Sequence, residues 1–178
     1  MLDIVKAMKL SNRLQFIYEN LVPGLSVWDF CCDHGYLGVE ALKSGQFPKV
    51  HFVDQVPHIV ESVEAVVAEK FPEFRSRANF FAGKGEEIAD VVSGNVVIAG
   101  VGAFAIFKIL RALLERELLQ AERLILCPQR DEEKFVKMLE ELGENFTARF
   151  SFTGATLLEE RSRSRVVYIF VRTSDDQN

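Results

Sequence analysis

Short runs of branched and aromatic residues alternate along this chain with longer stretches in which apolar residues recur at helical spacing. The short runs predict strands at residues 25–31, 50–54, 78–82, 95–100 and 123–127. The stretches between them predict helices at residues 36–44, 58–71, 86–92, 103–119 and 131–142. Strands that alternate with helices in this way form a parallel sheet with helices on both faces.

The pattern changes after Gly143, where two apolar runs, 146–154 and 164–172, follow each other without a helix between them. They predict an antiparallel hairpin at one edge of the sheet. The apolar spacing over residues 1–21 predicts a further helix before the first strand. We therefore expect an α/β, Rossmann-like fold, with a seven-stranded, mostly parallel sheet, an antiparallel C-terminal hairpin and helices on both faces.

No repeat, low-complexity tract or linker divides the 178 residues, so we expect one domain over residues 1–173, N-terminal helix included, and a disordered tail at 174–178. A content of 48% hydrophobic and 26% charged residues excludes a disordered or fibrous protein. The N-terminus lacks the apolar stretch of a secretory signal, and no run is long enough to span a membrane. We therefore expect a cytoplasmic protein that does not bind a membrane.

The net charge of −5 argues against a protein that coats nucleic acid by bulk electrostatics, although it leaves room for a local basic patch. Three cysteines cannot form a complete disulfide framework, which indicates reduced thiols. Cys31, Cys32 and His34 lack the number and the spacing of zinc ligands, so we expect no metal.

Polar residues and glycines follow the predicted strands, at the edge where open α/β sheets bind their ligands. The first strand leads into the polar turn 29–37, and the second ends at Asp54. A carboxylate at that position can accept hydrogen bonds from both hydroxyls of a ribose, although it can also serve only as a cap for the next helix. Glycines that let a ligand approach the backbone follow the third and fourth strands, at Gly83, Gly85, Gly100 and Gly102.

Two common phosphate-binding motifs are absent from the sequence. It has no G-x-x-x-x-G-K-[ST] loop, and the first turn has no G-x-G-x-x-G. Their absence argues against hydride transfer with NAD. An acidic first turn, an acid after the second strand and glycines after the third and fourth suit S-adenosylmethionine, which carries one ribose and no phosphate.

Several motifs resemble those of the bacterial tRNA adenine-22 N1-methyltransferases, a group of class I methyltransferases. They are Leu10-Ser11-Asn12-Arg13-Leu14, Asp29-x-x-x-Asp33-His34-x-Tyr36-Leu37, Asp54, Gly83-x-Gly85, Ile98-Ala99-Gly100-x-Gly102 and Leu124-Ile125-Leu126-x-Pro128. They occur in the family's order and cover most of the chain. The resemblance implies the class I fold, S-adenosylmethionine as cofactor, and N1 of an adenine in tRNA as acceptor.

The residues expected to bind the cofactor lie at the strand ends. They are Asp29, Cys31, His34, Asp54, Gln55, Gly83, Lys84, Gly85, Ala99, Gly100 and Gly102. Asp29 is expected to bond the amino acid end of the cofactor or to organise the turn, and His34 to bond backbone there. A purely structural role is the alternative for both.

The sequence departs from the family pattern at several of these positions. The family usually has Gly in place of Cys31, an acidic residue in place of Lys84, Met-Gly-Gly in place of 101–103 and Gln in place of Cys127. The Cys31 side chain would point towards the methionine part of the cofactor, and Lys84 removes an acceptor for the adenine amino group. We therefore expect a reduced cofactor affinity. The helical region that the family usually has after the last strand, thought to help hold tRNA, does not occur within these residues.

Methyl transfer is an in-line displacement at a sulfonium carbon, in which the protein mainly aligns the reactants. Asp33 is the candidate for taking up the proton released after transfer to adenine N1. Tyr36 is the candidate for stacking on the base, with simple packing as an equal alternative. Pro128 and Gln129 are expected to border the acceptor entrance, where Gln129 either reads a base edge or caps the next helix.

The partner implied by the resemblance is tRNA, and local basic groups are candidates for its phosphates. They are Lys6, Lys9, Arg13, Arg161, Arg163 and Arg165. The alternative is a solvated hairpin whose arginines are balanced by Glu159 and Glu160. Two other functions stay open at this point, a non-catalytic adaptor that keeps the fold and a methyltransferase for a small molecule or a protein. The sequence does not specify the oligomeric state.

Overall fold

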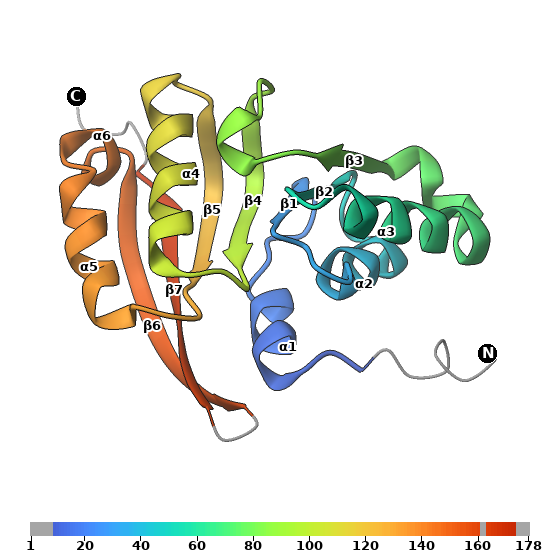
Figure 1. Cartoon of the computed structure of the whole chain (residues 1–178), viewed down its shortest axis with the longest axis horizontal. Helices are drawn as coiled ribbons and strands as arrows, with labels where there is room; N and C mark the ends of the chain where they lie inside the picture. Colours follow the sequence, from blue (N-terminus) through green and yellow to red (C-terminus); the bar gives the residue numbers. More distant parts are fainter. Residues whose placement is uncertain (1–8, 161–162, 174–178) are drawn as a thin grey trace.

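The structure of the chain, a computed structural model, describes residues 9–160 and 163–173. Its centre is a seven-stranded sheet with the order β3-β2-β1-β4-β5-β7-β6 (Figure 1). The strands are β1 (Val27–Phe30), β2 (Val50–Asp54), β3 (Ala78–Ala82), β4 (Val92–Ala99), β5 (Leu119–Cys127), β6 (Phe150–Glu160) and β7 (Arg163–Arg172). Strands β1 to β5 pair in parallel, whereas β7 pairs antiparallel with β5 and β6. The predicted sheet is therefore confirmed.

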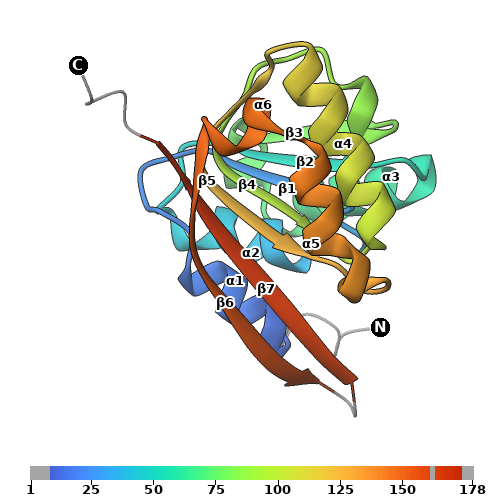
Figure 2. The same ribbon diagram turned by 90° about the vertical axis from the view of Figure 1, so that its left-hand side faces the viewer.

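Helices cover both faces of this sheet, as predicted. They are α1 (Asn12–Glu19), α2 (Tyr36–Ser44), α3 (Pro57–Lys70), α4 (Ala103–Glu115), α5 (Glu132–Glu141) and the short α6 (Glu144–Thr147), with 3-10 turns η1 (Pro72–Arg77) and η2 (Gly85–Glu87). Figure 2 shows α1 and α2 on one side of the sheet and α4 and α5 on the other. Val63 and Val67 of α3 join the apolar cluster on the side of α1 and α2.

The core consists of two apolar clusters, one on each face of the sheet. Strand β4 contributes to both, because successive side chains of a strand point to opposite faces. Val96 and Ile98 pack with α4 and α5, whereas Val97 packs with α1 and α2. Burial on both faces explains why the parallel strands are continuous apolar runs in the sequence.

The N-terminal helix is shorter than predicted. Of the predicted range 1–21, residues 1–8 lie outside the described residues, and the helix begins only at Asn12. Ser11 is its N-cap, and its Oγ accepts a hydrogen bond from the backbone N–H of Leu14 at 3.4 Å. This cap sets the start of the helix at Asn12, which the apolar spacing alone does not reveal.

A buried asparagine that the sequence analysis did not single out fixes the chain after α1. Asn95 of β4 is fully buried, and its Oδ1 accepts a hydrogen bond from the N–H of Val22 at 2.7 Å. Its Nδ2 donates to the carbonyl groups of Val22 at 3.0 Å and Ser26 at 3.3 Å. These bonds hold the loop between α1 and β1 against the sheet.

Two predicted helices are wrong in extent. The range 86–92 forms only the turn η2, after which the chain extends again and enters β4. The helix predicted for 103–119 ends at Glu115, because Glu117 adopts a left-handed conformation with φ 58° and β5 starts at Leu119. A left-handed residue cannot continue a right-handed helix.

The strand boundaries also differ from the prediction. Strands β4 and β5 begin before 95–100 and 123–127, because polar and charged residues at their starts interrupt the apolar pattern. The strand predicted for 146–154 begins at Phe150, since the residues before it form α6 and its following turn. It then continues to Glu160, which makes the hairpin longer than expected.

The predicted tail at 174–178 lies outside the described residues, as do Lys6 and Arg161. Lys9 is described, and it precedes α1 instead of lying within it. In the parts of the chain that the structure describes, no helix combines the length and the apolar character needed to cross a membrane.

Candidate functional site

A cavity of about 240 Å³ lies at the carboxyl ends of β1, β2 and β4, where open α/β sheets bind ligands. We call it the main cavity. Its walls come from the turn after β1, from Asp54 at the end of β2 and from residues 99–101 after β4. Arg13 and Leu14 of α1, Ile59 of α3 and Gln129 after β5 complete the lining. Six separate segments of the chain therefore converge on one site.

The turn after β1 has an unusual backbone. Cys31, Asp33 and Gly35 adopt left-handed conformations with φ 60°, 50° and 68°. The N–H groups of Cys31 and Cys32 both donate to the carbonyl of Val53, at 2.7 and 3.2 Å, which ties the turn to β2. Non-glycine residues with positive φ are uncommon, and they concentrate at functional sites.

Asp29 lies at the base of the main cavity. Its side chain is buried, and its Oδ2 accepts a hydrogen bond from the N–H of Gly38 in α2 at 3.2 Å. Burial raises the pKa of Asp29 to about 7, with a smaller contribution from the carboxylates of Asp54 and Asp33 and an opposing one from Gly38 and Arg13. Its Oδ1 accepts no hydrogen bond from the described residues, and Asp29 is one of the residues that line the cavity.

Asp54 connects the two turns at the end of the sheet. Its Oδ1 accepts a hydrogen bond from the N–H of Val56 at 3.0 Å, and its Oδ2 accepts one from the N–H of Asp33 at 3.4 Å. The first bond forms a turn before α3 and does not cap the helix, whose N-cap is Val56 and has no side-chain hydrogen bond. A carboxylate has about four acceptor positions, so two remain for a ligand.

A second cavity of about 90 Å³, here called the side cavity, lies between the end of β2 and the start of α4. Asp54, Cys31 and Val101 line both cavities, so the two meet at these residues. Gln55, Gly83 and Gly85 line the side cavity, together with apolar side chains that include Val53 and Ile109.

Glycine is required at two positions around these cavities. A Cβ atom on Gly85 would lie 2.9 Å from side-chain atoms of both Ile109 and Phe30, closer than side chains pack. Gly100 has φ +85°, a conformation that favours glycine. Gly85 lets the backbone pack closely against Ile109 and Phe30 in the wall of the side cavity. Gly100 lets the chain turn beside Ala99 in the lining of the main cavity.

Cys31 is one of the three residues that line both cavities, and it is partly buried. Burial raises the pKa of its thiol to about 12, and the carboxylates of Asp54 and Asp29 contribute. The thiol is therefore uncharged at neutral pH and is a poor nucleophile, because the reactive form of cysteine is the thiolate. Both cavities exist with this side chain in place.

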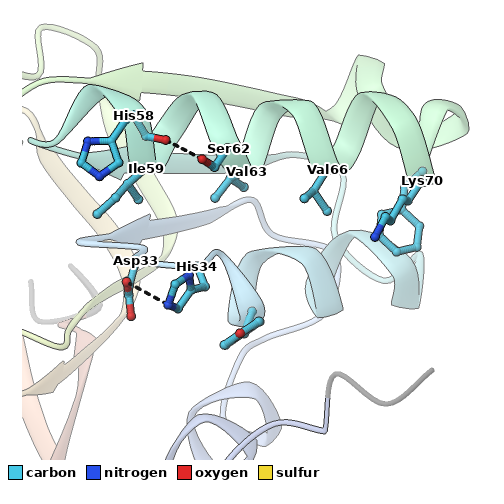
Figure 3. A pocket seen from close by; sticks show the side chains of 10 residues that line it. Asp33, His34, His58, Ile59, Ser62, Val63, Val66 and Lys70 are labelled. Atoms are coloured by element: carbon cyan, nitrogen blue, oxygen red, sulfur yellow. Dashed lines mark hydrogen bonds and ion pairs between the residues drawn. The ribbon is translucent and has the colours of Figure 1, made fainter. Parts of the chain in front are cut away.

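Asp33, His34 and Tyr36 form the mouth of the main cavity. The Nε2 of His34 lies 3.7 Å from the Oδ1 of Asp33, and the ring centres of His34 and Tyr36 are 5.4 Å apart. All three also line an outer cavity of about 370 Å³ between α2 and α3, shown in Figure 3 with Ile59 and Lys70 on its opposite wall. They are thus accessible to a ligand that approaches from solvent.

Two predicted cofactor residues do not line either cavity, and neither does Pro128, which was expected at the acceptor entrance. Lys84 is exposed and lies 3.8 Å from Glu87, so its ammonium group does not fill the side cavity. Gly102 caps α4, and its carbonyl accepts a hydrogen bond from Ala105 at 3.0 Å. The other predicted cofactor residues line at least one of the two cavities. Ile59 and Val101 were not predicted, because apolar residues give no sequence signal of a site.

A family model described as a methyltransferase domain matches residues 10–149. The chain belongs to this methyltransferase family. No curated protein sequence matches the chain. In the described parts of this methyltransferase, no group of three or more His, Cys, Asp or Glu side chains is placed to hold a metal ion.

Solved structures share the fold of this methyltransferase over nearly its whole length. The Bacillus subtilis tRNA m1A22 methyltransferase TrmK has 25% identity and a TM-score of 0.78, with 96% of this chain and 69% of that chain covered. A proposed tRNA m1A22 methyltransferase of Streptococcus pneumoniae has 24% identity and a TM-score of 0.78, over 96% and 73%. Mycoplasma capricolum TrmK, solved with S-adenosylhomocysteine, has 14% identity and a TM-score of 0.73, over 95% and 72%.

Proposed function

We propose that this chain is an S-adenosylmethionine-dependent methyltransferase that acts in the cytoplasm on N1 of an adenine in tRNA. The observation that carries the proposal is the pair of cavities that meet at Asp54 and Cys31 on the carboxyl edge of the sheet. The similar structures add support, since one of them, from S. pneumoniae, holds S-adenosylmethionine and one holds S-adenosylhomocysteine. All but one of the sequence motifs that resemble the tRNA adenine methyltransferases contribute residues to these cavities, the exception being Leu124-Ile125-Leu126-x-Pro128.

The residues present fit this cofactor. The free acceptor positions of Asp54 suit the two hydroxyls of a ribose. The apolar side chains of the side cavity, which Gln55, Glu86 and Lys108 also line, suit an adenine ring. Asp29, whose Oδ1 has no partner among the described residues, would hold the ammonium group of the amino acid end. Each part of the cofactor thus has a complementary surface.

The cofactor supplies a methyl group on a sulfonium when it is bound. The chain's own residues would align the acceptor base and exclude water. Tyr36 would stack on the base at the mouth, and the small residues Ala99 and Gly100 leave space for it. Asp33 would take up the proton that the methylated base releases. The protonated thiol of Cys31 does not compete with the base for the methyl group.

Transfer of a labelled methyl group from S-adenosylmethionine to tRNA tests this proposal. We expect N1-methyladenosine in the digested RNA and none when the adenine at tRNA position 22 is replaced by guanine. Transfer only to small molecules or proteins in an acceptor panel would contradict the RNA assignment. Binding of S-adenosylhomocysteine without transfer to any acceptor would contradict the assignment as an enzyme and favour a non-catalytic adaptor.

Replacing Cys31 by glycine is expected to tighten the binding of S-adenosylhomocysteine a few-fold. The substitution removes a side chain between the two cavities. It also removes the cost of about 1–2 kcal/mol that a non-glycine residue incurs in the left-handed conformation of this position. The greater flexibility of unfolded glycine offsets about 0.5–1 kcal/mol of this gain in folding free energy. Calorimetric titration measures the affinity, and Cys31→Ala is the control because it keeps the Cβ atom. Weaker binding by Cys31→Gly would show that the thiol contributes to the site.

A further inference from the structure

A fourth cavity, of about 370 Å³, adjoins the main cavity and is lined by three arginines. We call it the arginine cavity. Arg13 and Gln129 line both cavities, and Arg163, Arg165 and Glu160 complete this one. A group held there would lie beside the main cavity, at the wall formed by Arg13 and Gln129.

The hairpin and α1 bring these arginines together. Arg163 and Arg165 alternate along β7 with Ser164, so they lie on the same face of the strand as Val167. Val167 belongs to the apolar cluster on the side of α1 and α2. Figure 1 shows the tip of the β6–β7 hairpin extending past the ends of β4 and β5, on the same side as α1. The two arginines therefore face the region in front of the main cavity.

The charge of this cavity is opposite to that of the whole chain. Three guanidinium groups and one carboxylate leave two net positive charges in the cavity, whereas the chain carries a net charge of −5. Glu160 is engaged by Arg13, whose Nε lies 3.4 Å from its Oε2. Arg163 and Arg165 form no ion pair with any acidic side chain among residues 9–160 and 163–173. Two unneutralised guanidinium groups thus face the cavity.

We propose that the arginine cavity binds a backbone phosphate of the RNA acceptor, beside the base that enters the main cavity. This inference rests on the proposed function. Guanidinium groups bind phosphate oxygens through two parallel, charge-assisted hydrogen bonds, so paired arginines suit a phosphate better than a neutral acceptor. A phosphate held there would fix the register of the RNA without reading its sequence. Gln129, shared by both cavities, lies where it would contact the nucleotide between them.

Binding of a tRNA transcript to the full chain, followed by fluorescence anisotropy, tests the arginine cavity. Arg163→Gln and Arg165→Gln are each expected to raise the Kd about fivefold to tenfold. Each is also expected to lower the slope of log Kd against log salt concentration by about one, which corresponds to the loss of one phosphate contact. Arg172→Gln is the matched control, because Arg172 is exposed at the other end of the same strand, roughly 20 Å or more away. Thermal unfolding checks that the variants fold.

The outcomes separate this inference from the proposed function. Equal affinity of Arg163→Gln, Arg165→Gln and Arg172→Gln for tRNA would overturn the phosphate site, even if the wild-type chain methylates tRNA. Absence of methyl transfer by the wild-type chain would overturn the proposed function, while the binding comparison would still decide the role of the arginines. A wild-type chain that does not bind tRNA at all would overturn the phosphate site as well.

Discussion

Asp54→Ala is expected to lower the affinity for S-adenosylhomocysteine about 100-fold. The carboxylate lies where the two cavities meet and is the only group proposed to bond the ribose. A hydrogen bond to a charged group contributes about 1.5–3 kcal/mol, and about 1.4 kcal/mol corresponds to tenfold in affinity. Loss of two such bonds therefore accounts for the expected change. Isothermal titration measures it.

Two further variants separate binding from folding in this experiment. Asp54→Asn retains an oxygen that can accept the hydrogen bond from Val56 but loses the charge, so its affinity should fall between those of the wild type and Asp54→Ala. Asp90→Ala changes an exposed carboxylate outside both cavities and should bind like the wild type. A folded Asp54→Ala protein that binds as tightly as the wild type would reject the ribose assignment.

Asp29→Asn is expected to stabilise the protein at neutral and alkaline pH while it weakens cofactor binding. Burial raises the pKa of Asp29 from 3.8 to about 7 in the folded chain. Between these values the folded state binds more protons than the unfolded state, so this group lowers stability progressively as pH rises from about 4 to about 7. Above that range the variant should exceed the wild type by about 2–4 kcal/mol in the free energy of unfolding.

Denaturant unfolding across this pH range measures the effect. The difference in the free energy of unfolding between Asp29→Asn and the wild type should grow from pH 4 to pH 7 and then stay level. Asparagine keeps an oxygen that can accept the hydrogen bond from Gly38, so the turn is expected to survive. A difference that is the same at every pH would show that the Asp29 carboxyl is not destabilised by burial.

Apolar patterning predicts the elements that are buried on both faces. The strand at 50–54, which contributes to both core clusters, occurs with the predicted boundaries, and so does the helix at 36–44, whose apolar face packs into one of them. Elements with polar starts, such as β4 and β5, were predicted too short. The sequence also does not reveal the cap of α1 by Ser11, which depends on a local hydrogen bond.

The strand-end rule predicts most of the candidate site, because parallel strands bring their carboxyl ends to one edge. Asp29, Asp54 and Gly85 lie around the cavities for that reason. The convergence of Arg13 with Arg163 depends instead on how the long hairpin and α1 pack, and no local pattern encodes it.

The central claim is that the main and side cavities together bind the cofactor. Titration of the chain with S-adenosylhomocysteine, followed through backbone amide NMR resonances, tests this claim most directly. We predict that the largest shifts fall on residues 31–36, Asp54, Gly85 and Gly100. Shifts confined to Val66 and Lys70 around the outer cavity, or no shifts at high micromolar ligand, would contradict it.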